Sequence, residues 1–354
     1  MLQPPTKKAS NSSEMKKNIS WINYVRFLCL FLVYFYHTEN RVDFGFLGRG
    51  FDVFFKPFFV NAFFIVSGYL LYRKQEQIYQ RVKNIRTYFR QYGIDYLQNI
   101  LFTLIIPSII FSLVLFFPKT LLRHQEIDWS LLIKQTIGGG SLWFVAALAV
   151  AQLLIFGLLF FRKFSLLLWG GYGISCFFIA ALLHRSGYAN VPWYYQSGMC
   201  AVFFIWVGAL VYKFEPFLFF HLKSLWVLLF ICYVLLIYNC HSVINLGSVK
   251  FNLEGILFSL LSSMILISFC SWLKPNKFVE KVGRQTIGLY FLSGAVPEFV
   301  SILVKRFIEF GNVVFLVVVV ISFALSIVLN NFLLKHAKFV FDLRKIRQNN
   351  RISE

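Results

Sequence analysis

The chain has 354 residues, of which 58% are hydrophobic and only 14% are charged, and its mean hydropathy is +0.67. A soluble domain of this length needs far more polar surface, so the composition excludes an ordinary soluble protein and predicts an all-α, polytopic transmembrane bundle. The net charge of +20 does not by itself indicate a nucleic-acid partner, because membrane proteins collect Lys and Arg on their cytoplasmic side.

Apolar stretches long enough to cross a hydrocarbon core follow one another along the whole chain. Ten are expected, near 22–38, 57–72, 94–117, 141–161, 164–184, 197–213, 224–240, 252–273, 286–304 and 313–335. This pattern predicts three parts, which are a disordered cytoplasmic tail over 1–20, a membrane-embedded domain over 21–340 and a basic cytoplasmic tail over 341–354.

The distribution of basic residues predicts the orientation of these spans. An even number of spans places both termini on one side of the membrane. If that side is the cytoplasm, the cytoplasmic segments hold 24 of the 35 lysines and arginines and the outer loops hold 10. This bias predicts cytoplasmic termini and explains the positive charge without nucleic acid.

The first span, "NYVRFLCLFLVYFYHTEN", carries two ionisable residues that are unusual inside a membrane helix, Arg26 and His37. Eleven residues correspond to about three full helical turns, so the two side chains share one face and lie about 16 Å apart along the axis. Two interpretations are open. Either both residues reach the headgroups at the two ends of the helix, or they form a polar stripe that faces the bundle interior.

Arg-x10-His in the first span resembles the signature of the acyltransferase 3 family of integral-membrane O-acyltransferases. Four further segments resemble motifs of the same family, in the same order. They are "FFIVSGYLLYRK" (Phe63–Lys74), "SLWFVAAL" (Ser141–Leu148), "FFIWVGALVYK" (Phe203–Lys213) and "TIGLYFLS" (Thr286–Ser293). Together the resemblance covers roughly residues 20–335.

The sequence departs from the family pattern at two places. The motif of the penultimate span often ends in Tyr-x-x-His, whereas Ser293 stands at that position here. Many members also carry an Arg shortly before the Ile-Pro of the third span, but Asn99 precedes Ile106 and Pro107. These departures leave an inactive family member as one alternative.

The resemblance implies transfer of an acyl group, commonly acetyl, from cytoplasmic acyl-CoA to a hydroxyl of a cell-envelope sugar or glycan precursor. Acyl-CoA would be a co-substrate, with no permanently bound cofactor and no metal, and the protein would lie in the inner membrane. In this chemistry His37 is the expected base or transient acyl carrier, because imidazole serves either role near neutral pH. Arg26 is expected to hold the anionic donor.

Six basic residues between Arg73 and Arg90 are predicted to face the cytoplasm, and Arg86 and Arg90 stand four residues apart on one predicted helix face. They are the predicted ligands of the CoA phosphates. Ordinary positive-inside charge explains the same residues equally.

The remaining candidate site residues come from three other spans. Glu298 is an intramembrane carboxylate, expected at a depth similar to that of His37 and able to pair with it. Trp143, Tyr69 and Ser67 are the candidates for contacts with the sugar, although interfacial anchoring or helix packing explains them as well.

A transporter of a small anion or lipid-linked sugar is the alternative from another functional class, since a polar stripe also suits a translocation pathway. Transporters often contain internal repeats and interrupted spans in matching halves. No repeat is visible in this sequence, which favours the enzyme.

Overall fold

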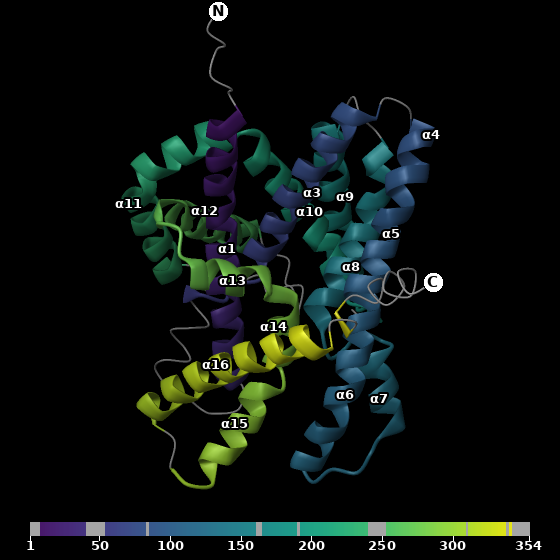
Figure 1. The fold of residues 1–354 in the computed structure, drawn as a ribbon, viewed down its shortest axis with the longest axis vertical. Helices are drawn as coiled ribbons and strands as arrows, with labels where there is room; N and C mark the ends of the chain where they lie inside the picture. Colours follow the sequence, from purple (N-terminus) through teal and green to yellow (C-terminus); the bar gives the residue numbers. More distant parts are fainter. Residues whose placement is uncertain are drawn as a thin grey trace, which may run out of the picture.

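The computed structural model describes residues 8–39, 54–82, 85–160, 165–189, 192–239, 253–308, 311–337 and 340–341. All regular secondary structure in these ranges is helical, as predicted (Figure 1). In chain order the helices are α1 (Lys8–Glu39), α3 (Asn61–Arg81), α4 (Ile85–Tyr88), α5 (Ile94–Ile100), α6 (Ile106–Leu122), α7 (Trp129–Thr136), α8 (Trp143–Phe156), α9 (Ser165–Arg185), α10 (Tyr195–Lys213), α11 (Glu215–Asn239), α12 (Leu253–Trp272), α13 (Lys277–Arg284), α14 (Thr286–Ser293), α15 (Val296–Lys305) and α16 (Asn312–His336).

Within the described residues, five helices are long and apolar enough to cross a membrane, and a sixth span results if the bent pair α14–α15 is counted as one. They confirm the membrane class, while the count of ten and the side of the termini stay predictions. Helix α1 carries Arg26, His37 and several tyrosines within its apolar sequence. A helix surrounded by protein tolerates such residues because their partners are other side chains rather than lipid.

Helix α1 begins at Lys8, within the range of the tail predicted over 1–20. No Gly or Pro interrupts the sequence from Lys8 to Glu39, so the helix extends from the membrane segment toward the N-terminus without a break. The tail predicted over 341–354 lies outside the described residues, apart from its first position.

The segment from Arg86 to Leu122 forms one helical run of 37 residues across α4, α5 and α6, with π-helical turns at Phe89–Gly93 and Leu101–Ile105. Its length of about 50 Å exceeds the roughly 30 Å thickness of a hydrocarbon core. Basic residues stand at both ends, Arg86 and Arg90 at one and Lys119 and Arg123 at the other. The run therefore presents its charges beyond both faces of the apolar layer.

Helices α3 and α10 pack backbone against backbone at the centre of the fold. A Cβ added to Gly68 would lie 2.0 Å from the carbonyl oxygen of Ile205, and one added to Gly208 would lie 2.0 Å from that of Ile65. Both glycines belong to the segments that resemble family motifs. Close glycine contacts of this kind are a frequent means of joining membrane helices.

The ninth predicted span, 286–304, is not one straight helix. It divides into α14 and α15, which are bent by 42° at a break around Gly294 and Ala295. Pro297 in the first turn of α15 has no N–H to continue the ladder of α14, which accounts for a new helix starting there. Helix α16 packs against both α15 and α1, and crosses in front of α1 in Figure 1.

Candidate functional site

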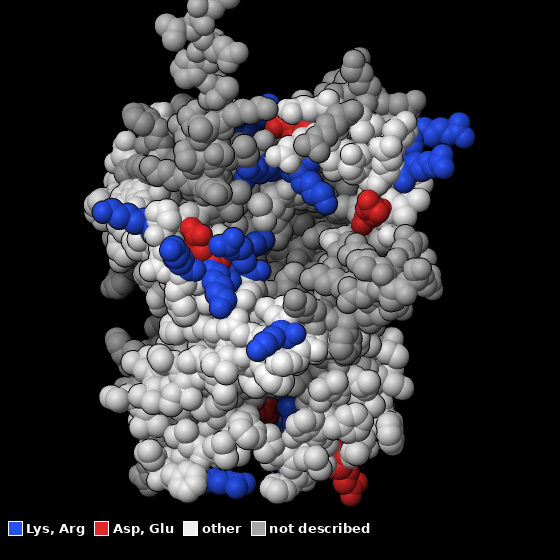
Figure 2. Space-filling view, in the orientation of Figure 1, with Lys and Arg blue, Asp and Glu red and all other residues white. Residues whose placement is uncertain are grey.

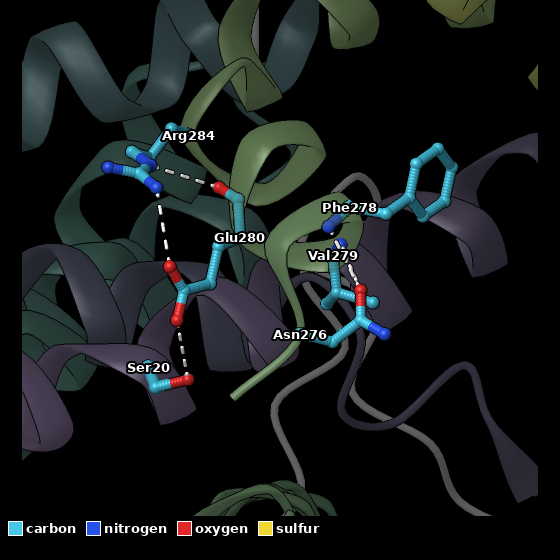
Figure 3. Close-up of polar contacts among 6 residues, drawn as sticks. All are labelled: Ser20, Asn276, Phe278, Val279, Glu280 and Arg284. Carbon is cyan, nitrogen blue, oxygen red and sulfur yellow. Dashed lines mark hydrogen bonds and ion pairs between the residues drawn. The ribbon is translucent and has the colours of Figure 1, made fainter. Parts of the chain in front are cut away.

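The N-terminal half of α1 is fixed by polar contacts with segments that are distant in the sequence. Ser20 Oγ donates to Glu280 Oε1 at 3.1 Å, and Arg284 Nη2 donates to Oε2 of the same carboxylate at 3.3 Å (Figure 3). The Asn276 side chain caps α13 by accepting from two backbone amides of its first turn. The Tyr24 hydroxyl donates to the carbonyl of Lys274 at 2.6 Å. These contacts set the rotation and depth of α1.

Arg26 and His37 lie on the buried face of α1. Each is itself half-buried, and the residues that flank them on the same helical stripe are almost completely enclosed, namely Ile22, Cys29, Leu30 and Val33. With about 100° per residue, both side chains fall at the centre of this enclosed arc. The placement favours the interior polar stripe over headgroup anchoring, and the roles of the two residues in transfer stay predictions.

His37 lies at the aromatic end of this stripe, in the last turn of α1. Its ring centroid is 5.6 Å from that of Tyr36, and the Tyr36 ring lies 6.1 Å from that of Phe59. The Tyr34 hydroxyl donates to the backbone carbonyl of Leu289 at 2.8 Å and ties this part of α1 to α14.

Phe144 connects three of the motif segments beside this end of α1. Its ring centroid lies 5.4 Å from that of Phe63, 4.9 Å from that of Phe64 and 5.1 Å from that of Tyr290. Leu289, the neighbour of Tyr290, accepts from the hydroxyl of Tyr34, which lies three residues before His37. The fold thus brings segments of α3, α8 and α14, which are far apart in the sequence, to the His37 end of α1.

Trp143 is half-buried at the start of α8, and its ring lies 6.0 Å from that of Tyr194. The Trp143 ring also lies 6.4 Å from that of Phe144, so Tyr194 belongs to the same aromatic wall. Trp193 and Tyr194 both have positive φ, at 62° and 50°, a conformation that non-glycine residues rarely adopt. Their sequence contains no Gly or Asn that signals such a turn, which is why Tyr194 was missed. Sugar contact at Trp143 stays a prediction.

Tyr69 and Ser67 lie further along α3 than Phe63 and Phe64, the residues that contact Phe144. Tyr69 is 1% exposed, and its hydroxyl donates to Glu215 Oε2 at 2.7 Å, while Trp21 Nε1 donates to Oε1 at 3.4 Å. Burial raises the pKa of the Glu215 carboxyl above its ordinary value of 4.5. Ser67 is half-buried. The Tyr69 hydroxyl therefore joins α3 to α11, and substrate contact by either residue stays a prediction.

Glu298 is 3% exposed, and Arg123 Nε donates to its Oε1 at 2.6 Å. Arg123 is 35% exposed and comes from the end of α6. The sequence interpretation did not include this partner, because the two residues are separated by 175 positions. The proposed pairing of Glu298 with His37 stays a prediction.

Arg86 and Arg90 are both exposed at one end of the long α4–α6 run. Arg86 lies in α4, and Arg90 lies in the π-helical turn that begins at Phe89, so their shared helix face and their role with CoA phosphates stay predictions. Figure 2 shows that lysines and arginines gather over the upper half of this view, the half in which α1 begins, whereas the lower half is mostly uncharged.

Ser293, at the position where the family often has His, is 1% exposed and donates to the backbone carbonyl of Tyr290 at 2.7 Å. A buried serine with its hydroxyl bonded in this way stabilises the end of α14. The effect of this serine on activity stays a prediction.

Comparison with known families gives one match that covers most of the chain. The profile of the acyltransferase 3 family, described as an acyltransferase domain, matches residues 19–331. Searches among curated proteins and among solved structures give no significant match. The matched residues include all five motif segments and every helix from the membrane part of α1 through most of α16. The chain therefore belongs to the acyltransferase 3 family, whose activity is the transfer of an acyl group.

Proposed function

We propose that the protein transfers an acetyl group from cytoplasmic acetyl-CoA to a hydroxyl of a cell-envelope sugar, as a ten-span protein of the inner membrane with both termini in the cytoplasm. The observation that supports this most directly is the enclosed stripe on α1, which carries a cation and an imidazole about 16 Å apart. That separation suits an extended thioester arm whose anionic end lies toward Arg26 and whose acyl end lies toward His37.

In the proposed reaction His37 takes the proton of the acceptor hydroxyl while the hydroxyl oxygen attacks the thioester carbonyl. The carbon–sulfur bond breaks, the new ester forms, and the imidazolium returns the proton to the departing CoA thiolate. Arg26 stabilises negative charge on the donor. Exposed Arg86 and Arg90 serve the CoA phosphates at the membrane surface.

The acceptor hydroxyl would meet the aromatic residues that surround the His37 end of α1. Trp143, Tyr194 and Tyr290 provide ring faces and hydroxyl groups there. Flat aromatic faces of this kind suit the apolar face of a sugar ring.

The test uses purified protein in nanodiscs with radiolabelled acetyl-CoA, and it follows CoA release and label transferred to acceptor or retained on the protein. His37→Ala is expected to lower turnover by at least about 100-fold, the usual contribution of a general base. His221→Ala, which changes an exposed imidazole on α11, is the matched control and should keep wild-type turnover. Full transfer by His37→Ala would refute the assignment.

One observation favours the transporter alternative. The α14–α15 pair is a discontinuous helix, a feature that transporters use to build binding sites in the membrane. If neither protein binds or consumes acetyl-CoA, uptake of a labelled anionic sugar into liposomes becomes the discriminating measurement. Binding without turnover in the wild type would instead identify an inactive member and implicate Ser293.

A further inference from the structure

Helix α13 lies at the depth where α1 passes from polar to apolar sequence. The first part of α1 is mostly polar, and its apolar sequence begins at Trp21. The Ser20 hydroxyl, directly before this change, donates to Glu280 of α13. A Cβ added to Gly283 would lie 2.3 Å from the carbonyl oxygen of Asn23, so the two backbones are in direct contact just after the change. This position corresponds to the headgroup level of a bilayer rather than to its hydrocarbon core.

Two exposed aromatic side chains mark the same level. Trp272 is the last residue of α12 and is 43% exposed. Phe278, in the first turn of α13, is 55% exposed, and its ring centroid lies 6.2 Å from that of Phe27 on α1. Trp is enriched at the boundary between hydrocarbon and headgroups, and exposed Phe anchors helices that lie in this boundary. The two rings therefore indicate that α13 lies in the membrane interface.

The exposed face of α13 is basic. Lys277, Lys281 and Arg284 are all exposed, and their spacing of four and three residues puts them within an arc of about 60° along about 10 Å of helix. Lys274, directly before the helix, is a fourth exposed cation, whereas Val282 on the opposite face is buried. Figure 2 shows lysines and arginines gathered on the face of the molecule where α13 lies in Figure 1. A short helix with one buried face and one basic face is typical of contact with an anionic membrane surface.

The one acidic residue of α13, Glu280, is engaged by α1 and by its own helix. It accepts from Ser20 and pairs with Arg284 (Figure 3), and its side chain is 25% exposed while that of Arg284 is 67% exposed. Arg284 Nε also donates to the backbone carbonyl of Glu280 at 3.1 Å, which fixes the guanidinium on the helix surface. The charges of Lys277 and Lys281 are therefore not offset within α13, and they complement the charge of phosphate groups.

We propose that the exposed face of α13 binds the phosphate groups of anionic phospholipids, and that bound lipid stabilises the packing of α13 on α1. Each lysine near an anionic membrane surface adds to such binding. Arg284 links a bound phosphate to Glu280 and, through that carboxylate, to Ser20 of α1. A bilayer lipid fits better than a soluble polyanion because Trp272 and Phe278 place the cations beside the headgroups.

The lipid site does not depend on acyl-transfer chemistry, so its first test needs no turnover. Full-length protein in an uncharged detergent is titrated with dioleoylphosphatidylglycerol or dioleoylphosphatidylcholine, and the melting temperature is followed. Phosphatidylglycerol is expected to raise the melting temperature by about 3 °C or more beyond phosphatidylcholine, because it binds the folded state. About 0.5 M NaCl should remove most of this difference by screening. Equal effects of the two lipids, or a difference that salt leaves unchanged, would overturn the proposal.

A double variant locates the site on α13. Lys277→Gln with Lys281→Gln removes two charges and leaves the contacts of Figure 3 in place. The concentration of phosphatidylglycerol that gives half of the rise in melting temperature is expected to increase about 30-fold. Lys134→Gln with Lys305→Gln removes the same charge from exposed positions on α7 and α15, and should change that concentration less than about twofold. A similar increase in both double variants would contradict the assignment, because net charge would then be the cause.

CoA is a second polyanion that the test separates from lipid. Free CoA is expected to leave the effect of phosphatidylglycerol unchanged. If CoA abolishes that effect, and the double variant at Lys277 and Lys281 also binds acetyl-CoA about 30-fold more weakly, the basic face belongs to the donor and the lipid site is refuted.

Failure of the lipid site and failure of the proposed function give different results. If phosphatidylglycerol has no specific effect but acetyl-CoA turnover depends on His37, the lipid site is wrong and the enzyme assignment stands. If phosphatidylglycerol acts through α13 as expected but His37→Ala retains full transfer, the lipid site is correct and the catalytic assignment falls.

Discussion

At the scale of single residues, the clearest addition by the structure is the half-buried carboxylate of Glu215. It accepts from Tyr69 and Trp21 and thereby joins α3, α11 and α1 at one point. The sequence gives no sign of this role, because Glu215 follows the basic end of α10 and resembles an ordinary surface residue there. Its importance comes from partners that are 146 and 194 positions away.

The raised pKa of Glu215 leads to a prediction about pH and stability. A carboxyl whose pKa is raised by folding contributes stability below its ordinary pKa of 4.5, and that contribution is lost as the pH rises through the raised value. Glu215→Gln keeps an acceptor for Tyr69 and carries no charge to desolvate. As the pH rises above about 4.5, we expect the melting temperature of the variant in detergent to fall less than that of the wild type.

The matched control for this prediction is Glu126→Gln, which changes an exposed carboxylate in the loop between α6 and α7. It should follow the wild-type pH profile of the melting temperature. If Glu215→Gln also follows that profile, the carboxyl titrates at its ordinary pKa and burial does not shift it.

At the scale of elements, the glycine contacts between α3 and α10 decide how closely the central helices approach. Gly68→Ala would place a methyl group 2.0 Å from a backbone carbonyl oxygen, and backbone cannot move aside as a flexible side chain can. The two helices must therefore separate. Overpacking of this kind lowers the free energy of unfolding by about 1–3 kcal/mol or more. Thermal unfolding in detergent measures the effect.

Gly171→Ala is the control for this substitution, since no atom lies within 4 Å of the added Cβ in α9. It should leave the melting temperature unchanged or raise it slightly, because Ala favours the helix over Gly. Equal melting temperatures for Gly68→Ala and wild type would show that α3 and α10 do not pack in the described way.

The bend between α14 and α15 shows what span prediction misses at this scale. Hydropathy over 286–304 is continuous, so the sequence predicted one helix. The break depends on Pro297 in the first turn of α15 and on Arg123 at the end of α6. The Arg123 side chain donates to Glu298, the residue that follows Pro297. Hydropathy averages over such local interruptions and therefore does not detect them.

At the scale of the whole molecule, the distribution of charge predicts which end faces the cytoplasm. Arg86 lies at one end of the α4–α6 run, and Glu126 lies in the loop beyond its other end. We expect Glu126→Cys to react with a membrane-impermeant maleimide in intact cells, because the less basic end faces outward. Arg86→Cys should react only after the membrane is permeabilised.

The unmodified protein, with its native cysteines, is the control for both labelling experiments. Four of its described cysteines are buried, and Cys232 is exposed on the apolar α11, so little reaction with a polar reagent is expected. Labelling of both introduced cysteines from the same side would refute the orientation.

The sequence by itself determined the membrane class, the helical architecture, the family and the shared face of Arg26 and His37. These features depend on composition, on motif order and on the 3.6-residue period of one helix, all of which are local properties of the chain. Only the tertiary structure decided which face of α1 is enclosed, that Glu298 bonds to Arg123, that Tyr69 bonds to Glu215, and that Lys56 lies over the Tyr36 ring. Each of these depends on segments brought together from distant parts of the sequence, and periodicity within one segment contains no information about the partner it will meet.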